Sequence, residues 1–484
     1  MGLGYIADRL ASMDLSRYDC ILIPGMIPGD ASIITSRLGV PAYKGPKHAA
    51  DLAYVLRALA SGAKLSTTRP ACEVLAEGLR AKALDELGGL EGSIDRSRAL
   101  RVGRGRRCRW VGGGAPIRVV AEILSAPLLS DEELVARARR LVAQGADVVD
   151  VGMLSDDPRP HEVRRLVRAV RRAVEVPVSV DTVDEDEVVE AVRAGADMVI
   201  SVTPELAERF GKVAGIVGFR RAAYVVVPYT PGRGPARGAK ERAHEALRAA
   251  REVRRWGARK VIIDPLLDPP IAPGCFEALE ACRLIKSRSP ATPLMLGAGN
   301  VTELMDADSV GVNALLAALA VELGVDLLLT AEGSDKTRGS VEELAVAVRM
   351  ACLARRRQAP PKDLGIDLLR LKEKRRREVD GVEVEGVMVV EASSRGGPPM
   401  DPAGSFKVWV DRGRGVIAVA HYRRGELRPS MVVEGRRAMD IRDELVERGL
   451  VSDLKHAFYL GYELAKAEVA LKTGRSYVQD EPLF

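Results

Sequence analysis

The chain has 484 residues, of which 47% are hydrophobic and 29% charged, and a formal net charge of +6. This length favours two or three domains, this composition indicates a folded globular protein, and the charge excess is too dilute to indicate nucleic-acid binding. Because no uncharged apolar run is long enough to cross a membrane, and because Asp8 and Arg9 interrupt the N-terminal stretch, we expect a cytoplasmic protein with neither a membrane anchor nor a signal peptide.

Residues 1–100 predict a small α/β domain. An apolar strand at Cys20–Gly25 is followed by helical stretches at His48–Ala60 and Pro70–Leu90. The next segment, 101–116, is rich in glycine and arginine, so we expect it to be a basic, flexible linker.

Residues 117–356 alternate short β-branched strands with amphipathic helices. Eight such units over about 240 residues match a (β/α)8 TIM barrel, whereas a doubly wound open sheet usually has fewer repeats. The predicted strands are Ile117–Leu124, Asp147–Gly152, Val176–Asp181, Asp197–Val202, Ala222–Val227, Lys260–Asp264, Pro293–Gly297 and Asp326–Thr330.

The helices between these strands carry start signals. Ser130 with Glu133, and Ser340 with Glu343, have the spacing of a capping box, in which the first side chain bonds to the third helical N–H. The predicted helices include Asp131–Gln144, His161–Ala173, Ala239–Trp256 and Val341–Ala354.

The rest of the chain predicts a linker and a third domain. Residues 357–383 are rich in arginine and proline and indicate a linker or a solvent-exposed helix. Residues 384–484 indicate an α+β domain of common size. Its expected elements are strands at Val387–Ala392, Phe406–Val410 and Val416–His421 and a closing helix at Asp453–Lys472.

Polar side chains end several barrel strands, where TIM barrels place their active sites. Asp150 lies near the end of the second predicted strand, Asp181 ends the third and Asp264 the sixth, and Asn300 follows the seventh. A single aspartate there is often only the cap of the next helix. Three carboxylates and an amide at one mouth suit a flat heterocycle with several N–H donors, because paired hydrogen bonds fix its orientation.

Positive charge follows the eighth strand, where 333–340 reads GSDKTRGS. Lys336, Arg338 and the helix start at Ser340 predict a phosphate or pyrophosphate site, since barrels often bind phosphate after strands seven and eight. The dispersed cysteines and histidines show no metal-ligand spacing, so we expect no metal site built from protein side chains.

Four segments, in this order and spacing, resemble the pterin-binding barrel of the dihydropteroate synthases, a fold shared with the pterin-dependent methyltransferases. They are GADVVDVG (Gly145–Gly152), VPVSVDT (Val176–Thr182), AGADMVISV (Ala194–Val202) and VIIDP (Val261–Pro265). Segments at both ends of the chain resemble the flanking domains of archaeal dihydropteroate synthase-related proteins.

The resemblance implies roles for five residues. Asp181 and Asp264 hold the edge of the pterin ring, with Asp150 in support. Asn300 is a further contact, because GAGNVTE resembles the GLSNVS segment of the methyltransferases. Ser201 is a weak substitute where an Asn-Asp pair is usual. The chain lacks the family's Asn after strand one and its Ser-Arg-Lys after strand seven, which affects arylamine and pyrophosphate handling more than the pterin pocket.

The resemblance leaves three functions open. The first is a transferase that joins 6-hydroxymethyl-7,8-dihydropterin diphosphate to an arylamine in folate or methanopterin biosynthesis, with Mg²⁺ bound through the substrate's pyrophosphate. Its arylamine is p-aminobenzoate or a ribosylated aminobenzene phosphate. The second presents a methyl-tetrahydropterin to a corrinoid partner, and the third binds a reduced pterin without catalysis. Barrels of this family often pair, so we expect a homodimer.

Overall fold

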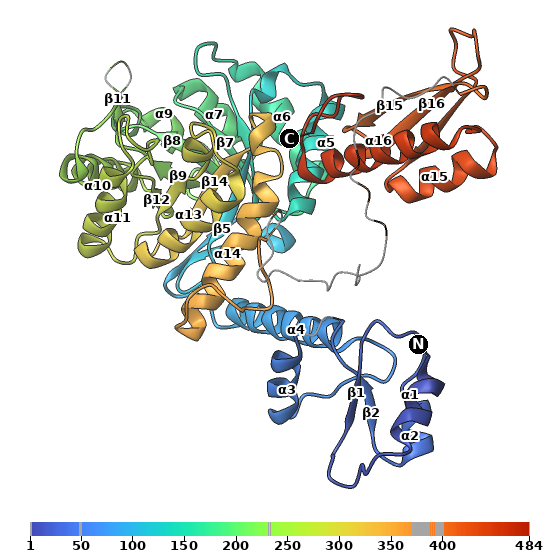
Figure 1. The fold of residues 1–484 in the computed structure, drawn as a ribbon. Helices are drawn as coiled ribbons and strands as arrows, with labels where there is room; N and C mark the ends of the chain where they lie inside the picture. Colours follow the sequence, from blue (N-terminus) through green and yellow to red (C-terminus); the bar gives the residue numbers. More distant parts are fainter. Residues whose placement is uncertain are drawn as a thin grey trace. The chain divides into compact units, whose positions relative to one another are not determined.

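The structure is a computed structural model that describes residues 2–47, 51–230, 232, 234–369, 371, 388, 390, 392 and 401–483. The chain divides into two compact units, Met1–Glu378 and Val379–Phe484. The barrel belongs to the first unit (Figure 1). The predicted strand at Val387–Ala392 lies largely outside the described residues.

An 8-stranded parallel sheet forms the barrel in the order β12-β9-β8-β7-β6-β5-β14-β13. A parallel bridge between Ile263 and Leu294 joins the two outer strands, so the ring is nearly closed. The barrel prediction is confirmed. The strands are β5 (Arg118–Ile123), β6 (Val148–Gly152), β7 (Val178–Asp181), β8 (Met198–Val202), β9 (Ala223–Val226), β12 (Val261–Ile263), β13 (Met295–Gly297) and β14 (Leu327–Ala331).

Helices cover the outside of this ring (Figure 1). They are α5 (Asp131–Gln144), α6 (Pro160–Ala173), α7 (Glu185–Ala194), α8 (Pro204–Glu208), α9 (Gly211–Ala214), α10 (Ala239–Arg255), α11 (Phe276–Arg288), α12 (Gly299–Thr302), α13 (Ser309–Leu323) and α14 (Ser340–Arg357). Short 3-10 turns lie at η3 (Ala126–Leu128) and η4 (Asp335–Thr337), and a small hairpin pairs β10 (Tyr229–Thr230) with β11 (Gly234–Pro235).

One of the two predicted capping boxes is present. Ser130 caps α5, accepting a hydrogen bond from Glu133 N while the Glu133 side chain accepts from Ser130 N. The box at Ser340 is wrong, because Gly339 occupies the N-cap position of α14 and Ser340 is the first helical residue. Packing of α14 against α13 directs the Ser340 hydroxyl to Asn313 Nδ2, 2.9 Å away, instead of to its own helix.

Strand residues alternate between two apolar layers, as the period of a β-strand requires. Inward-facing side chains such as Val120, Val148 and Met198 fill the lumen. Outward-facing ones such as Val119 and Val149 pack under the helices. The lumen is therefore a packed core along most of its length, and polar side chains face inward only near its ends.

The segment 101–116 is an ordered hairpin and not a flexible linker. β3 (Ala99–Val102) pairs antiparallel with β4 (Arg109–Gly112), with η2 (Gly105–Arg107) between them. Val102 and Val111 are fully buried in the inner core. The hairpin thus closes the amino-terminal end of the barrel. The linker prediction is wrong because it rested on the glycine and arginine content of the segment and not on its two buried valines.

The N-terminal elements of the first unit form a small α/β layer, as predicted. β1 pairs parallel with β2, and α1 and α2 pack on the same small core. The elements are α1 (Leu3–Leu10), β1 (Ile21–Ile23), α2 (Ser32–Leu38), β2 (Ala42–Lys44), α3 (Leu52–Ala60) and α4 (Ala71–Gly92).

The second unit is a three-stranded antiparallel sheet packed on two helices. Two of its strands and its last helix match the predicted elements, whereas β17 and α15 were not predicted. The elements are β15 (Ser405–Asp411), β16 (Val416–Tyr422), β17 (Met431–Gly435), α15 (Ala438–Glu447) and α16 (Leu454–Thr473). Within the part of the chain that the structure describes, no helix is both long and apolar enough to span a membrane.

Candidate active site

Three neighbouring strands bring carboxyl groups together at the carboxyl end of the barrel. Glu122 of β5 pairs in register with Asp150 of β6, and Gly152 pairs with Asp181 at the end of β7. One oxygen from each of the three carboxyl groups lies within 4.8 Å of the others. The sequence analysis identified Asp150 and Asp181 but missed Glu122, although a carboxylate near the carboxyl end of the otherwise apolar run Val119–Ile123 could have signalled it.

Like charges at this distance cannot all ionise in an apolar barrel. Burial raises the pKa of Glu122 to about 8, and the Asp181 carboxylate adds to this shift. Burial raises the pKa of Asp150 well above its ordinary value, reinforced by Asp181 and Glu122. It also raises the pKa of Asp181, which the Ser201 hydroxyl opposes. The cluster therefore holds protons at neutral pH.

Asp264 lies across the mouth, directly after β12, and is 4% exposed. Burial raises its pKa to about 7, against the N–H of Leu266, which donates to Oδ1 at 2.8 Å. The Asp181 carboxylate also raises the pKa of Asp264. Asp181 and Asp264 therefore lie close enough across the mouth for the charge of Asp181 to shift the pKa of Asp264.

The buried Arg242 of α10 supports this strand end. Its guanidinium donates to Leu266 O at 2.6 Å and pairs with Asp268. Asp268 is therefore an anchor of the loop after β12.

Asn300 and Ser201 also reach the mouth. Asn300, on α12, is exposed and donates from Nδ2 to Leu267 O at 2.9 Å. Ser201 has φ of +65°, at an irregularity in the pairing of β8 with β9. Ser125 and Leu266, at φ of +50° and +60°, share this left-handed conformation. Such strained non-glycine residues concentrate at functional sites, and these three all lie at the carboxyl ends of barrel strands, Ser201 within β8 and the other two just after β5 and β12.

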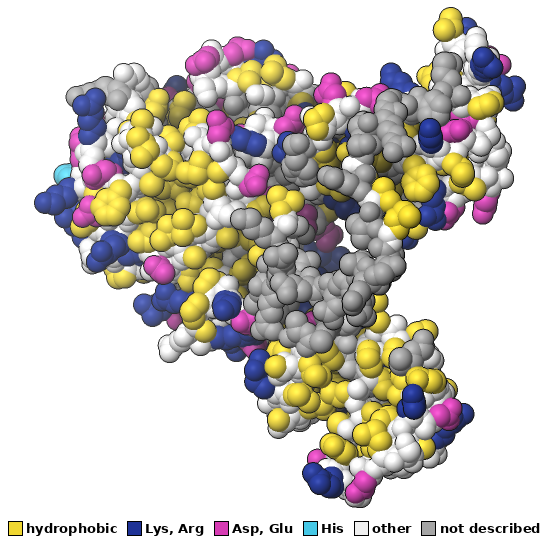
Figure 2. Space-filling model, viewed as in Figure 1, with side chains coloured by type: hydrophobic (Ala, Val, Ile, Leu, Met, Phe, Trp, Pro, Cys, Tyr) yellow, Lys and Arg dark blue, Asp and Glu magenta, His cyan; other side chains and the backbone are white. Residues whose placement is uncertain are grey.

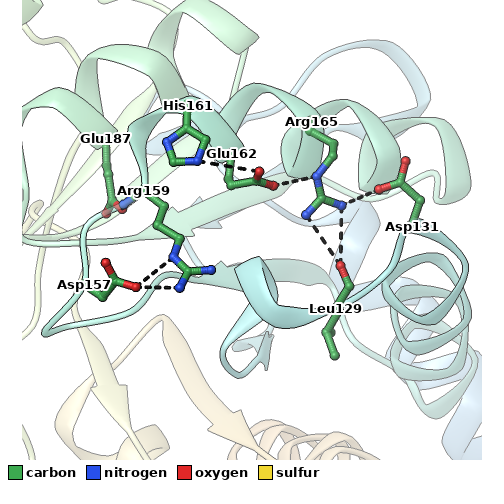
Figure 3. A network of polar contacts seen from close by, with 8 residues as sticks. All are labelled: Leu129, Asp131, Asp157, Arg159, His161, Glu162, Arg165 and Glu187. Atoms are coloured by element: carbon green, nitrogen blue, oxygen red, sulfur yellow. Dashed lines mark hydrogen bonds and ion pairs between the residues drawn. The ribbon is translucent and has the colours of Figure 1, made fainter.

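The loops around the mouth are braced by a polar network (Figure 3). Arg165 of α6 pairs with Glu162 and Asp131 and faces Leu129 O in the loop after β5. In the loop after β6, Arg159 donates its backbone N–H to Glu187 of α7 at 2.6 Å. Short loops held in this way keep the strand ends in place.

The structure separates the three residues of the predicted anion site. Lys336 donates to Met305 O at 2.9 Å and to Asp306 at 3.0 Å, and Arg338 approaches Asp335 at 3.4 Å. Ser340 is 0% exposed, so its hydroxyl cannot meet a ligand. The N–H of Gly339 already donates to Glu332, which leaves Lys336 and Arg338 as the available groups.

Comparison with known proteins adds family relationships. The family model described as pterin binding enzyme matches residues 125–330, and one described as PterinBD-DUF4346 matches residues 400–480. An uncharacterized protein of Methanocaldococcus jannaschii is 34% identical over 478 residues, which cover 96% of this chain and 87% of that protein. A Ycf91-like protein of Nostoc is 31% identical over 106 residues, covering 17% of this chain and 84% of that protein.

Solved structures of dihydropteroate synthases are similar to about half of the chain. The enzyme of Thermus thermophilus, in complex with 6HMPPP, is 24% identical with a TM-score of 0.38, and covers 52% of this chain and 97% of its own. The enzyme of Vibrio fischeri is 17% identical with a TM-score of 0.42, and covers 54% of this chain and 100% of its own.

Proposed function

Because the chain carries a domain of the pterin-binding enzyme family and belongs to one family with its Methanocaldococcus relative, we propose that it is a transferase that joins 6-hydroxymethyl-7,8-dihydropterin diphosphate to an arylamine and releases pyrophosphate. The observation that carries this proposal is the pair of buried carboxyl groups, Asp181 and Asp264, which interact across the barrel mouth. Carboxylates there accept the adjacent N–H groups along one edge of a pterin.

Each mouth residue then has a separate role. Asp264 and Asp181 fix the pterin ring, and Ser201 supports Asp181. Asn300 has an amide side chain, so it offers the ring both a hydrogen-bond donor and an acceptor. Asp150 lies beneath them and is 0% exposed, so it acts through its charge and its neighbours. No protein nucleophile is required, because departure of pyrophosphate leaves a cation-like methylene conjugated to the pterin, which the arylamine nitrogen attacks with loss of its proton.

Lys336 and Arg338 are the groups that we assign to the diphosphate. Their present partners, Asp306 and Asp335, have side chains that are 102% and 77% exposed. Ion pairs this exposed contribute little free energy, so a diphosphate would replace them at small cost. Mg²⁺ on the diphosphate would add to the positive charge that stabilises the leaving group.

The arylamine in this proposal is p-aminobenzoate or a ribosylated aminobenzene phosphate, which places the reaction in folate or methanopterin biosynthesis. The second candidate function is a methyl transfer from a methyl-tetrahydropterin to a corrinoid partner. Two observations favour it: Asn300 lies on α12 directly after β13, and burial raises the pKa of Glu122 to about 8, so that its carboxyl group keeps a proton at neutral pH that it could donate to a bound pterin. Binding without catalysis is the third reading.

One experiment separates the three functions. The full chain is incubated with dihydropterin diphosphate, Mg²⁺ and each arylamine, and pyrophosphate is measured; a parallel reaction contains methyl-tetrahydropterin and free cobalamin. Release of pyrophosphate only when an arylamine is present supports the synthase. Methylcobalamin formation without pyrophosphate release replaces it with the methyltransferase, and pterin binding with neither product leaves a binding protein.

We also propose a homodimer formed through α13. This helix carries no charged side chain from Ser309 to Val321, and Leu315 is 61% exposed. Figure 2 shows hydrophobic side chains gathered over the part of the barrel where Figure 1 labels α11 and α13. A helix that is apolar all round is normally covered, and a second copy of the barrel would cover it.

A further inference from the structure

The three carboxyl groups of Glu122, Asp150 and Asp181 form a compact oxygen cluster at the floor of the barrel mouth. Each comes from a different adjacent strand, and one oxygen of each lies within 4.8 Å of the others. The rigid sheet therefore sets their spacing. No lysine or arginine among the described residues forms an ion pair with any of the three.

A second observation points to something missing between these groups. Asp150 is 0% exposed, and neither of its carboxylate oxygens has a hydrogen-bond partner of normal geometry, although the Ser179 hydroxyl and the Val151 N–H lie near enough to oppose the rise in its pKa. Ser179, its register partner on β7, is also 0% exposed, and its hydroxyl has no partner of normal geometry. Buried polar atoms without partners are rare in folded proteins, and each one is costly.

The backbone is also shaped to hold the cluster. A Cβ atom at Gly152 would lie 2.2 Å from Glu122 Oε1, so only glycine leaves room for that carboxyl group. Gly152 is not at positive φ, so its backbone conformation does not itself require glycine. The space at Gly152 is therefore occupied by the Glu122 carboxyl, which turns toward Asp181 across the neighbouring strand.

We propose that Glu122, Asp150 and Asp181 bind a hard divalent cation, Mg²⁺ or Mn²⁺, with its remaining coordination positions open to the barrel mouth. An all-carboxylate set suits these cations, which prefer oxygen ligands and keep several positions for water or substrate. Each residue contributes one oxygen, so the second oxygen of Asp181 stays free for a pterin. The three protein ligands are independent of the proposed function. Only the expectation that diphosphate oxygens would replace water in the open coordination positions rests on it.

The test uses Mn²⁺ and the full-length chain freed of metal with EDTA and then dialysed. Electron paramagnetic resonance measures free Mn²⁺ during a titration without any pterin. We expect one site per chain in the natural protein and at least tenfold weaker binding in Glu122→Gln and in Asp150→Asn. Gly152→Ala, which removes no charge but displaces the Glu122 carboxyl, should also weaken binding.

The matched control is Glu187→Gln. Glu187 is a buried carboxylate near the same barrel end, but its oxygens accept from Thr182 and from the N–H of Arg159 (Figure 3), outside the cluster. Its loss should leave Mn²⁺ binding unchanged. A control variant that loses Mn²⁺ as strongly as Glu122→Gln contradicts the assignment.

Melting temperatures show whether a variant has merely failed to fold. In EDTA, Glu122→Gln should melt no lower than the natural protein, because it replaces a buried carboxyl group that stands beside two others with a neutral amide of similar size. Mn²⁺ should raise the melting temperature of the natural protein and not that of the variant. If the natural protein leaves the Mn²⁺ signal unchanged at millimolar concentration, the cluster shares protons instead and the proposal is wrong. Pterin binding, measured without metal, tests the proposed function separately.

Discussion

The two ends of the barrel handle inward-facing charge in opposite ways. At the amino-terminal end, the buried guanidinium of Arg118 donates to both oxygens of Glu91 and to Trp110 O and lies 3.7 Å from Asp147. At the carboxyl end, Asp150 is equally buried, and its carboxylate oxygens have no hydrogen-bond partner of normal geometry. The same strands carry both ends, so the barrel satisfies the buried charge where the hairpin closes it and leaves a buried carboxyl group poorly satisfied at the end where TIM barrels bind their ligands.

The largest effect should follow from removing the two cations at the mouth. Lys336→Ala combined with Arg338→Ala deletes two charge-assisted contacts to the diphosphate, and turnover should fall about a hundredfold or more. Binding of an unphosphorylated pterin, measured by calorimetry, should barely change. Lys212→Ala, which removes a cation on α9, is the control. Normal turnover in the double variant would contradict the diphosphate site and favour the second candidate function, methyl transfer from a methyl-tetrahydropterin to a corrinoid partner.

A change at the closed end should act on stability alone. Arg118→Ala leaves Trp110 O without its buried donor, breaks the bidentate pair with Glu91 and removes one of the two cations beside Asp147, so we expect the free energy of unfolding to fall by about 3 kcal/mol. Urea titration gives this value. Asp150→Asn, at the open end, should cause no comparable loss. An Arg118 variant as stable as the natural protein would remove the contrast between the two ends.

Asp264→Asn should weaken pterin binding by about 2 kcal/mol, because a charge-assisted pair becomes a mismatched amide. Asp181→Asn should act similarly. The control is Asp156→Asn, an exposed position in the loop after β6. Asp268→Asn is a separate case: it breaks the ion pair with Arg242, so it should destabilise the loop after β12. Unchanged affinity in the Asp264 variant removes this residue from the site.

Pterin affinity should rise with pH through the titration of Asp264. Because the pKa of this group is raised to about 7, the carboxylate that accepts two N–H groups is present above that pH and is lost by protonation below it. We expect affinity about tenfold weaker at pH 5.5 than at pH 8. Calorimetry at both pH values measures this, and Asp264→Asn should show a much flatter profile.

The smallest effect is expected from removing the second unit. Deleting 379–484 should leave pterin affinity unchanged, because every mouth residue lies in the first unit. The deletion begins after Leu368 because this side chain is buried in the outer core of the barrel. A truncated chain that folds, by circular dichroism, but no longer binds pterin would show that the second unit completes the site.

Much of the barrel and part of the site were predictable from local pattern. The eight strands follow from β-branched runs between helices, and Asp150, Asp181 and Asp264 from their positions at strand ends. The hairpin at 99–112 was not predictable, because Gly103 and its arginine-rich surroundings look like a linker until Val102 and Val111 are seen inside the barrel. The capping box predicted at Ser340 is absent for a related reason, because the Ser340 hydroxyl accepts a hydrogen bond from Asn313 of α13, which is distant in the sequence.

The sequence by itself determined the order of strands and helices, and with it the end of the barrel at which Asp181 and Asp264 gather, because strand direction follows from the chain. Only the tertiary structure decided which charges are satisfied. In the sequence Glu122 is one charge in a strand, whereas the structure places Gly152 and Asp181 beside it. The sequence shows no partner for Lys336, whereas the structure pairs it with Asp306. Register across neighbouring strands and contacts between distant loops set these distances, and the strength of an electrostatic interaction depends on distance and burial, which no local pattern encodes.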